Sequence, residues 1–209
     1  KWKLSLIKAY KKRGSILDYG CGTGEFLNTS HQAGYEITGI EPSEDARKKA
    51  MEITGKSIAS DLKEIQGRKF DVITLWHVLE HIQDFKEKLI SLKNLLGDHG
   101  ILLIAVPNHE SYDAKYYKEY WAGYDVPRHL WHFSKNNMNM LLRQLSMNLI
   151  EIKPMKLDAF YVSLLSENYK SQHSGTSANF IKGIRTGLKS NRLARKTKNY
   201  SSLIYIVRP

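Results

Sequence analysis

A short apolar run that leads directly into three alternating glycines limits most strongly how this chain can fold. Residues 15–19 read SILDY, residues 20–24 read GCGTG, and the helical pattern of residues 25–33 follows. Glycine adopts backbone dihedral angles closed to other residues, and its lack of a Cβ lets a ligand lie against the main chain. A strand, a glycine turn and a helix in this order predict an α/β sheet with a ligand beyond the carboxyl end of the strand.

Short apolar runs of the same kind recur along the chain and alternate with helical patterns. They are rich in Val, Ile and Leu, which is typical of strands in a parallel sheet covered on both faces. Ser43 is placed to cap one helix and Ser134 another. Strands are expected at residues 15–20, 35–40, 70–75, 100–106, 149–152 and 202–207, and helices at 25–33, 43–53, 85–96 and after Ser134. This alternation favours an open, doubly wound α/β sheet.

Two connections are much longer than the roughly two to six residues usual in such folds. They cover residues 108–133 and 158–200. We therefore predict one domain over residues 1–209 with two insertions, the first acting as a lid over the substrate. Residues 170–178 are polar and are the best candidate for a mobile loop.

Charge and cysteine content limit the partners and the compartment. The net charge is +11, and it belongs to the two ends: residues 1–14 hold six Lys/Arg, residues 170–209 hold nine, and neither end has an acid. Such ends can bind nucleic acid or anionic lipid, or form a solvated basic face, which is the commoner case. One cysteine excludes an intramolecular disulfide and a four-cysteine zinc site. No apolar run approaches the ~20 residues of a membrane span, and no signal peptide precedes the first strand, so a cytoplasmic protein is expected.

The glycine spacing argues against a dinucleotide. In the GxGxxG turn of a dinucleotide fold the third glycine would fall at position 25, where Glu25 stands. A carboxylate in the first helical turn also repels a pyrophosphate. A nicotinamide dehydrogenase is therefore the weakest alternative.

The segment DYGCGTG resembles the first motif of class I S-adenosylmethionine-dependent methyltransferases, and later segments continue the resemblance in order. GIEPS at residues 39–43 ends the second strand with an acid, SDL at 60–62 follows the third strand, and DVITLWHVLEHI at 71–82 and GILLIAVPN at 100–108 follow. The fourth of these is most similar to ubiquinone-type O-methyltransferases. The resemblance implies a Rossmann-like, mostly parallel seven-stranded sheet with an antiparallel terminal strand.

The resemblance also implies the cofactor, S-adenosylmethionine, which leaves as S-adenosylhomocysteine. Glu41 would bind both ribose hydroxyls, since a carboxylate can accept two hydrogen bonds from a diol. Asp61 stands where the family often has an adenine-contacting Asp, and Asp18 is expected to hold the loop more than to touch the ligand. The full set expected at the cofactor is Asp18, Tyr19, Gly20, Cys21, Gly22, Gly24, Glu41, Pro42, Asp61, Leu62, Trp76 and His77.

The segment after the fourth strand of the resemblance supplies the first candidates for chemistry. His77 and His81 are four residues apart, and with Glu80 they resemble a divalent-metal cluster of ubiquinone O-methyltransferases. That cluster has Glu where His77 stands, so no metal is predicted. If the acceptor is a hydroxyl, a general base helps the transfer, and histidine is the usual choice.

The long segment 108–133 supplies the others. It holds eight of the chain's 22 aromatic residues, together with the run DVPRHLWH at 125–132. Aromatic walls with a few polar groups suit a small-molecule pocket, although they could also stack RNA bases. His129 is the first choice of base and His77 the second. The residues expected at the substrate are Tyr124, Arg128, His129, Trp131 and His132.

We therefore predict a methyltransferase that acts on a small molecule, at oxygen. One alternative is an RNA methyltransferase, favoured by the basic ends and the aromatic segment, but the chain has no separate RNA-binding motif. The other is a methyltransferase-like binding module that has lost its chemistry. The intact glycines and Glu41 argue against loss of the cofactor.

Overall fold

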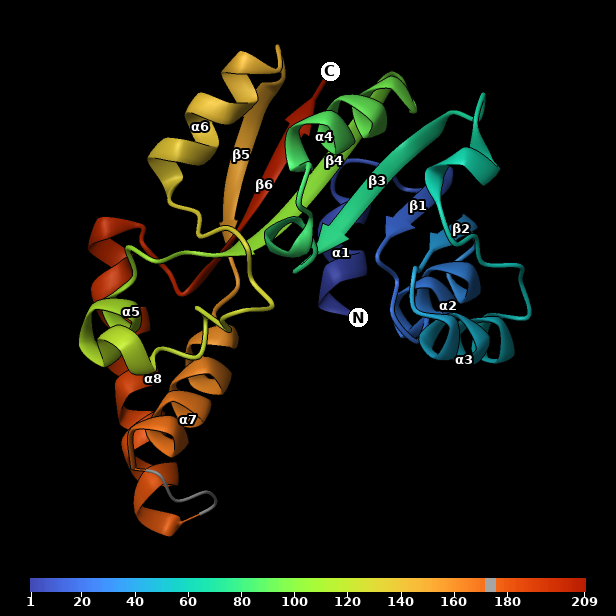
Figure 1. Cartoon of the computed structure of the whole chain (residues 1–209). Coiled ribbons are helices and arrows are strands. Elements are labelled where there is room, and N and C mark those ends of the chain that lie inside the picture. The colour runs from blue at the N-terminus through green and yellow to red at the C-terminus, as the bar shows by residue number, and fades with distance from the viewer. Residues whose placement is uncertain (172–175) are drawn as a thin grey trace.

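The computed structural model describes residues 1–171 and 176–209, and it has the predicted α/β architecture (Figure 1). The strands are β1 (Ser15–Tyr19), β2 (Glu36–Ile40), β3 (Phe70–Trp76), β4 (Leu96–Pro107), β5 (Asn148–Pro154) and β6 (Ser202–Arg208). They form one sheet in the order β2-β1-β3-β4-β6-β5. Strands β2, β1, β3 and β4 pair in parallel, and β6 runs antiparallel to both of its neighbours. The chain leaves β1 for β2 on one side and returns to β3 on the other, so the topological switch point lies between β1 and β3.

The predicted count of seven strands is wrong, because the described residues form a sheet of six. The missing strand would lie beside β2, before the SDL segment. There Ala59 makes a single parallel bridge with Ile40, with one hydrogen bond from the Ala59 amide to Gly39 and one from the Glu41 amide to Ala59. The preceding helix ends at the left-handed Gly55, and the next turn begins at Asp61. The few residues between them are too short for a longer ladder.

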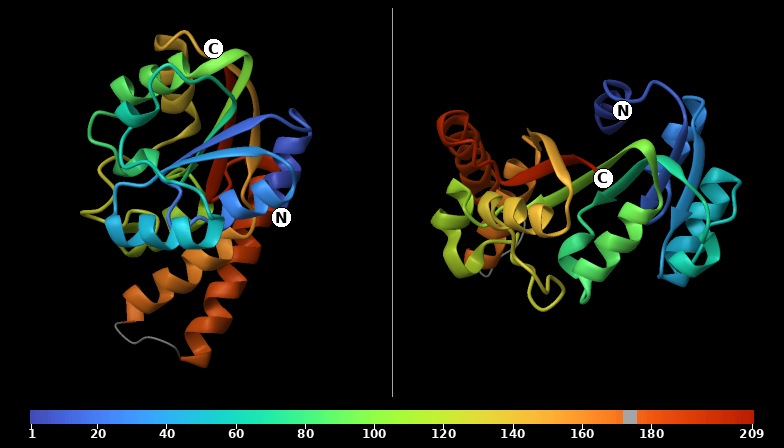
Figure 2. Two further views of the ribbon diagram at one scale, coloured as in Figure 1. Left: turned by 90° about the vertical axis from the view of Figure 1, so that its right-hand side faces the viewer. Right: turned by 90° about the horizontal axis from the view of Figure 1, so that it is seen from above.

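Helices cover both faces of the sheet (Figure 2). The helices of the sheet layers are α1 (Trp2–Lys8), α2 (Glu25–Gln32), α3 (Glu44–Thr54), α4 (Phe85–Asn94) and α6 (Lys135–Gln144), with the 3-10 turns η1 (Leu62–Ile65) and η2 (Leu79–His81). Ser43 and Ser134 cap α3 and α6 as predicted, each accepting a backbone N–H three residues on. The caps fix where these helices begin.

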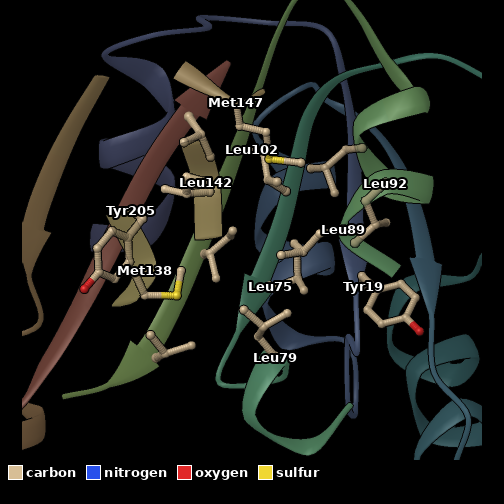
Figure 3. Close-up of a cluster of buried hydrophobic side chains, with 14 of the residues drawn as sticks. Tyr19, Leu75, Leu79, Leu89, Leu92, Leu102, Met138, Leu142, Met147 and Tyr205 are labelled. Carbon is tan, nitrogen blue, oxygen red and sulfur yellow. The ribbon is translucent and has the colours of Figure 1, made fainter. Parts of the chain in front are cut away.

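The core divides into two layers because side chains alternate along the strands. In β4, Ile101, Leu103 and Ala105 pack on the side of α1, α2 and α3, whereas Leu102 and Ile104 pack on the side of α4 and α6. Figure 3 shows the second layer, in which side chains of the sheet meet Leu89 and Leu92 of α4 and Met138 and Leu142 of α6. The central strands β1, β3, β4 and β6 are therefore buried on both faces, which accounts for their near-continuous apolar runs, whereas the edge strand β5 is partly exposed.

The two long connections form helices of their own. Residues 108–133 contain α5 (Tyr112–Tyr117) and η3 (Lys118–Tyr120), and residues 158–200 contain α7 (Asp158–Ser171) and α8 (Ser177–Thr197). The buried Asp113 joins them, accepting hydrogen bonds from Trp121 Nε1 (2.8 Å), Ser190 Oγ (2.6 Å) and Ser201 Oγ (2.6 Å). Of the loop predicted at 170–178, residues 172–175 lie outside the described residues, and the flanking residues include the ends of α7 and α8.

Among the described residues, we find no helix with the length and apolar character needed to cross a membrane.

Candidate functional site

The glycine loop lies at the switch point, between the end of β1 and the start of α2. Gly20, Gly22 and Gly24 all have positive φ, at 75°, 55° and 87°. The amides of Gly20 and Cys21 both donate to the Ile40 carbonyl (2.8 and 3.0 Å), which holds the loop against the end of β2. Ligands of open α/β sheets bind at such a point, outside the carboxyl ends of the strands.

Only the middle glycine leaves room for a ligand. A Cβ on Gly20 would lie 2.6 Å from Val78 Cγ2, and one on Gly24 would lie 3.0 Å from Ala50 Cα, so both serve close packing. A Cβ on Gly22 would meet nothing within 4 Å. Gly22 also donates its amide to Glu41 Oε2 (2.9 Å), so the open space lies next to a carboxylate.

Glu41 follows β2 directly and is held by the backbone on both of its oxygens. Oε1 accepts the Ser43 amide (2.9 Å) and Oε2 accepts the Gly22 amide. Each carboxylate oxygen has a second lone pair. The carboxylate is therefore oriented and can still accept from a diol. Pro42 lies beside it, exposed at the start of α3, and its carbonyl and that of Glu41 both accept from Arg47.

Asp18 lies in β1, just before the glycine loop. It is buried and accepts a 2.6 Å hydrogen bond from Thr74 Oγ1 of the neighbouring β3. Burial raises the pKa of Asp18 to about 7, although the Thr74 hydroxyl and the charge of Lys3 favour the carboxylate. The Asp18 side chain thus bonds the neighbouring strand, and its role in holding the loop stays a prediction.

Tyr19 and Cys21 turn their side chains into the protein. The ring of Tyr19 lies in the layer beneath α4 (Figure 3), and Lys88 Nζ stands 5.8 Å from it. Burial raises the pKa of the Cys21 thiol, which packs in the opposite layer. Only the main chain of these two residues is thus placed to face a ligand.

Asp61 and Leu62 lie at the start of η1. The Asp61 carboxylate accepts the Lys63 amide (2.9 Å) in a capping box that Glu64 completes. Both residues line a cavity of about 400 Å³ that Lys88 also reaches. The cap occupies one oxygen of Asp61 and leaves the other open.

Trp76, the last residue of β3, packs its indole against Phe26 and Trp2, at ring distances of 5.6 and 6.1 Å. Lys3 Nζ lies 4.5 Å from the ring. The indole Nε1 is buried without a hydrogen-bond partner in the described chain. A buried donor without an acceptor is costly, and a polar ligand at the switch point would supply one.

His77 is clamped between two carboxylates at the end of β3. Its Nε2 lies 2.9 Å from Asp158 Oδ2, its Nδ1 lies 3.3 Å from Glu80 Oε1, and its φ is +58°. Burial disfavours the charged ring, but the hydrogen bonds to Asp158 and Glu80 outweigh it and raise the pKa of His77 to about 9. At neutral pH His77 is therefore a cation with both nitrogens engaged. This argues against His77 as the base or as a metal ligand.

We expect this clamp to make stability depend on pH. The folded pKa of about 9 exceeds the ordinary 6.5, so its stabilisation is complete below pH 6.5 and is lost as pH rises through 9. Between about pH 7.5 and 9.5, the free energy of unfolding should fall by about 1 kcal/mol, after allowance for partial exposure. Denaturant titration of the wild type and of His77→Gln measures this. An equal slope in the variant would exclude His77 as its source.

His129 lies near the Glu80 carboxylate, which His77 also contacts. Its Nδ1 is 3.0 Å from the Gly123 carbonyl, which can only accept, so Nδ1 carries the proton and Nε2 the lone pair. Nε2 lies 4.0 Å from Glu80 Oε1 and 3.8 Å from Asp125 Oδ2. Burial lowers the pKa of His129, although the Gly123 carbonyl and Glu80 act in the other direction. The ring is therefore neutral at pH 7, which is the state that a general base needs.

The remaining histidine of the cluster packs against His129. The two rings meet edge to face at 4.6 Å, and His81 Nδ1 donates to the Arg128 carbonyl (3.0 Å). Glu80, His81 and His129 bring one ligand atom each within 4.8 Å of one another. Chemically this set could hold a divalent cation, although no metal was predicted, and it contains His129 where the sequence comparison had considered His77.

A cavity of about 510 Å³ opens beside these groups, at the carboxyl ends of β3 and β4. Lys3, His77, Pro107, Asp125, Arg128 and His129 line one part of it. The opposite wall comes from α7, which contributes Tyr161, Val162, Leu165 and Tyr169. Neither this wall nor the contact of Asp158 was predicted from the sequence. The four-residue spacing of Leu157, Tyr161, Leu165 and Tyr169 was the available signal.

The aromatic segment contributes less to this cavity than predicted. Of the five expected substrate residues, Arg128 and His129 line it, and Arg128 pairs with Asp125 (2.7 Å). Trp131 packs on Phe85 and donates Nε1 to the Ile82 carbonyl (2.9 Å). Tyr124 packs between Trp121 and His132, whose Nε2 bonds the Tyr124 carbonyl. These contacts give Tyr124, Trp131 and His132 the role of holding the segment in shape.

Comparison with known proteins shows which family the chain belongs to. Residues 2–152 match the family model described as a methyltransferase domain. The chain is 35% identical over 106 residues to the ubiquinone biosynthesis O-methyltransferase of Actinobacillus pleuropneumoniae serotype 5b (strain L20), covering 44% of this chain and 45% of that protein. It is 27% identical over 209 residues to the enzyme of that name from Pelagibacter ubique (strain HTCC1062), covering 86% and 81%. The match to the first relative thus spans less than half of its length.

Solved structures share the fold at low sequence identity. Magnesium protoporphyrin IX methyltransferase from Synechocystis, with bound S-adenosylhomocysteine, superposes with a TM-score of 0.63 at 16% identity, over 99% of this chain and 80% of that one. Phosphoethanolamine N-methyltransferase 2 of Haemonchus contortus, in complex with S-adenosylmethionine, gives 0.63 at 19% identity, over 100% and 52%. With the family model matched over most of its length, the chain belongs to the class I S-adenosylmethionine-dependent methyltransferases.

Proposed function

We propose that the chain transfers the methyl group of S-adenosylmethionine to a hydroxyl group of a small-molecule acceptor. The observation that carries this proposal is a neutral, half-buried His129 on the wall of the cavity beside the switch point. The similarity to ubiquinone biosynthesis O-methyltransferases supports oxygen as the methylated atom.

The residues at the switch point suit the cofactor. Open space at Gly22 and an oriented carboxylate at Glu41 fit a ribose, and the unpartnered Trp76 Nε1 offers a donor on the other side. None of these groups is an anion site, which agrees with a ligand that has no phosphates. Bound S-adenosylmethionine supplies a methyl group already activated by its positive sulfur.

The chain's own part is to align the acceptor, exclude water and remove a proton. The α7 wall and the edge of the aromatic segment enclose the acceptor. As the acceptor oxygen gains the methyl group, its proton passes to Nε2 of His129. The carboxylates of Glu80 and Asp125 lie about 4 Å from that nitrogen and favour the imidazolium that results.

The cofactor assignment predicts a specific binding result. Calorimetry should show S-adenosylmethionine and S-adenosylhomocysteine binding at micromolar concentration, with no binding of NAD. Glu41→Ala should weaken both by about 1–3 kcal/mol, because hydrogen bonds to a charged group are lost.

Glu52→Ala is the matched control, since Glu52 is an exposed acid on α3 away from the loop. Thermal unfolding without ligand separates lost ribose contacts from a loosened loop, because Glu41 also holds two backbone amides. Tighter binding of NAD, or equal affinities of the two variants, would contradict the assignment.

A further inference from the structure

One side of α8 packs against α7, and small residues make that packing possible. The buried residues of α8 are Asn179, Gly183, Thr186, Gly187, Ser190 and Ala194. A Cβ on Gly183 would lie 2.8 Å from Leu164, and one on Gly187 would lie 2.8 Å from Phe160. The bulky residues of α8 therefore do not face its partner helix.

A stripe of large apolar residues instead lies on the outer side of α8. Phe180 and Leu188 are eight residues apart, and their exposed fractions are 59% and 57%. Ile184, halfway between them and partly exposed, continues the stripe, and Ile181 beside it is 51% exposed. Residues spaced by four lie on one face of a helix. Such an apolar face on a projecting helix indicates a binding surface.

Basic residues run alongside the apolar stripe. Arg185, Lys189, Arg192 and Lys196 recur every three or four residues, and Lys182 and Arg195 flank them. Residues 177–197 contain no Asp or Glu. Within the described chain no carboxylate forms an ion pair with these bases, although Lys189 lies over the ring of Tyr112 (4.9 Å). The positive charge of this face is therefore left for a partner.

We propose that this outer face of α8 docks on an anionic lipid surface. A helix with Lys and Arg along one stripe and Phe, Ile and Leu along the next lies in the membrane interface, with its apolar side among the acyl chains. Anionic headgroups complement the bases, and the acyl region accepts the apolar stripe. RNA phosphates would pair with the Lys and Arg side chains, but the aliphatic Ile181 and Leu188 would remain in water.

The shape of the molecule leaves this face accessible. The α7–α8 hairpin projects away from the sheet (Figures 1 and 2). The other helix of the hairpin, α7, lines the 510 Å³ cavity through Tyr161 and Leu165. Docking of α8 would therefore bring that cavity close to the lipid surface. The docking itself requires neither cofactor nor turnover, so it can be tested apart from the proposed function.

Co-sedimentation of the full chain with vesicles tests the proposal. Vesicles of equal parts phosphatidylcholine and phosphatidylglycerol should bind the chain, and phosphatidylcholine alone should bind it far more weakly. Each base near an anionic surface contributes about five-fold to partitioning. The triple variant Lys182→Gln/Arg185→Gln/Arg192→Gln should therefore lower binding on the order of a hundred-fold. Added salt should weaken the binding of the wild type.

Matched variants distinguish binding through this face of α8 from the effects of net charge and of exposed apolar residues elsewhere. Lys49→Gln/Lys56→Gln/Lys86→Gln removes the same charge at exposed positions elsewhere and should bind nearly as the wild type does. Phe180→Ser/Leu188→Ser should lose most binding, whereas Ile90→Ser/Met140→Ser, at exposed positions on α4 and α6, should not.

Several results would overturn the proposal: no binding to anionic vesicles, equal loss in both charge triples, or equal binding to neutral vesicles. Filter binding with structured RNA is measured in parallel. Tight RNA binding without vesicle binding would assign the face to nucleic acid. A dimer that Leu188→Ser dissociates, again without vesicle binding, would assign it to a second copy of the chain.

Discussion

Replacing Gly22 with valine is expected to abolish binding of S-adenosylmethionine while the chain still folds. The residue has φ of +55°, and an added Cβ would meet nothing of the protein within 4 Å. A valine side chain would therefore fill the space beside Glu41 in which we place the ribose. We expect the affinity to fall by at least about a hundred-fold, because the ligand and the side chain cannot share that volume. Calorimetry with S-adenosylmethionine measures it.

Gly34→Val is the matched control for backbone strain. Gly34 has φ of +88°, and its Cβ would also meet nothing within 4 Å, but it lies in the turn between α2 and β2. Both valines adopt a left-handed conformation at a cost of about 1–2 kcal/mol, so both should lower the melting temperature similarly. Only Gly22→Val should lose the ligand. Equal affinities in the two variants would place the cofactor elsewhere.

The strand, glycine turn and helix and the two helix caps could be predicted from the sequence because their signals are local. The caps at Ser43 and Ser134 bond amides three residues on, and the three glycines follow β1 directly in the sequence. The alternation of apolar residues likewise predicts strands buried on both faces. The strand count failed at residues 56–60, where the fold makes a single bridge and sequence similarity implied a full strand.

Several contacts around the 510 Å³ cavity could not be predicted from the sequence because they join distant segments. His77 meets Asp158, 81 residues later in the chain, and that contact turns a candidate base into a cation. The cavity wall formed by α7 belongs to the long connection at residues 158–200. The length of that connection did not predict where its helices would pack. The aromatic content of residues 108–133 predicted a pocket, but Tyr124, Trp131 and His132 pack on neighbours within and beside that segment.

We expect His129→Ala to lower turnover by about 10²–10⁴-fold with little change in the affinity for S-adenosylmethionine. A positioned general base contributes this much to proton transfer, and the imidazole lies on the cavity wall and not at the glycine loop. His132→Ala is the matched control. That histidine belongs to the same segment, but its Nε2 is bonded to the Tyr124 carbonyl and it does not line the cavity. Release of S-adenosylhomocysteine with a panel of hydroxylated acceptors gives the rate.

The pH profile and a chelator distinguish a base from a metal ligand at this position. Burial lowers the pKa of His129 from its ordinary 6.5. The wild-type rate should therefore rise with pH, with the midpoint of the rise below pH 6.5, and should be constant at higher pH. This limb should be absent from the residual rate of His129→Ala. Treatment with EDTA should leave the wild-type rate unchanged if Nε2 removes the proton. If EDTA abolishes the rate and a divalent cation restores it, His129 instead completes a metal site with Glu80 and His81, and the proton must leave by another group.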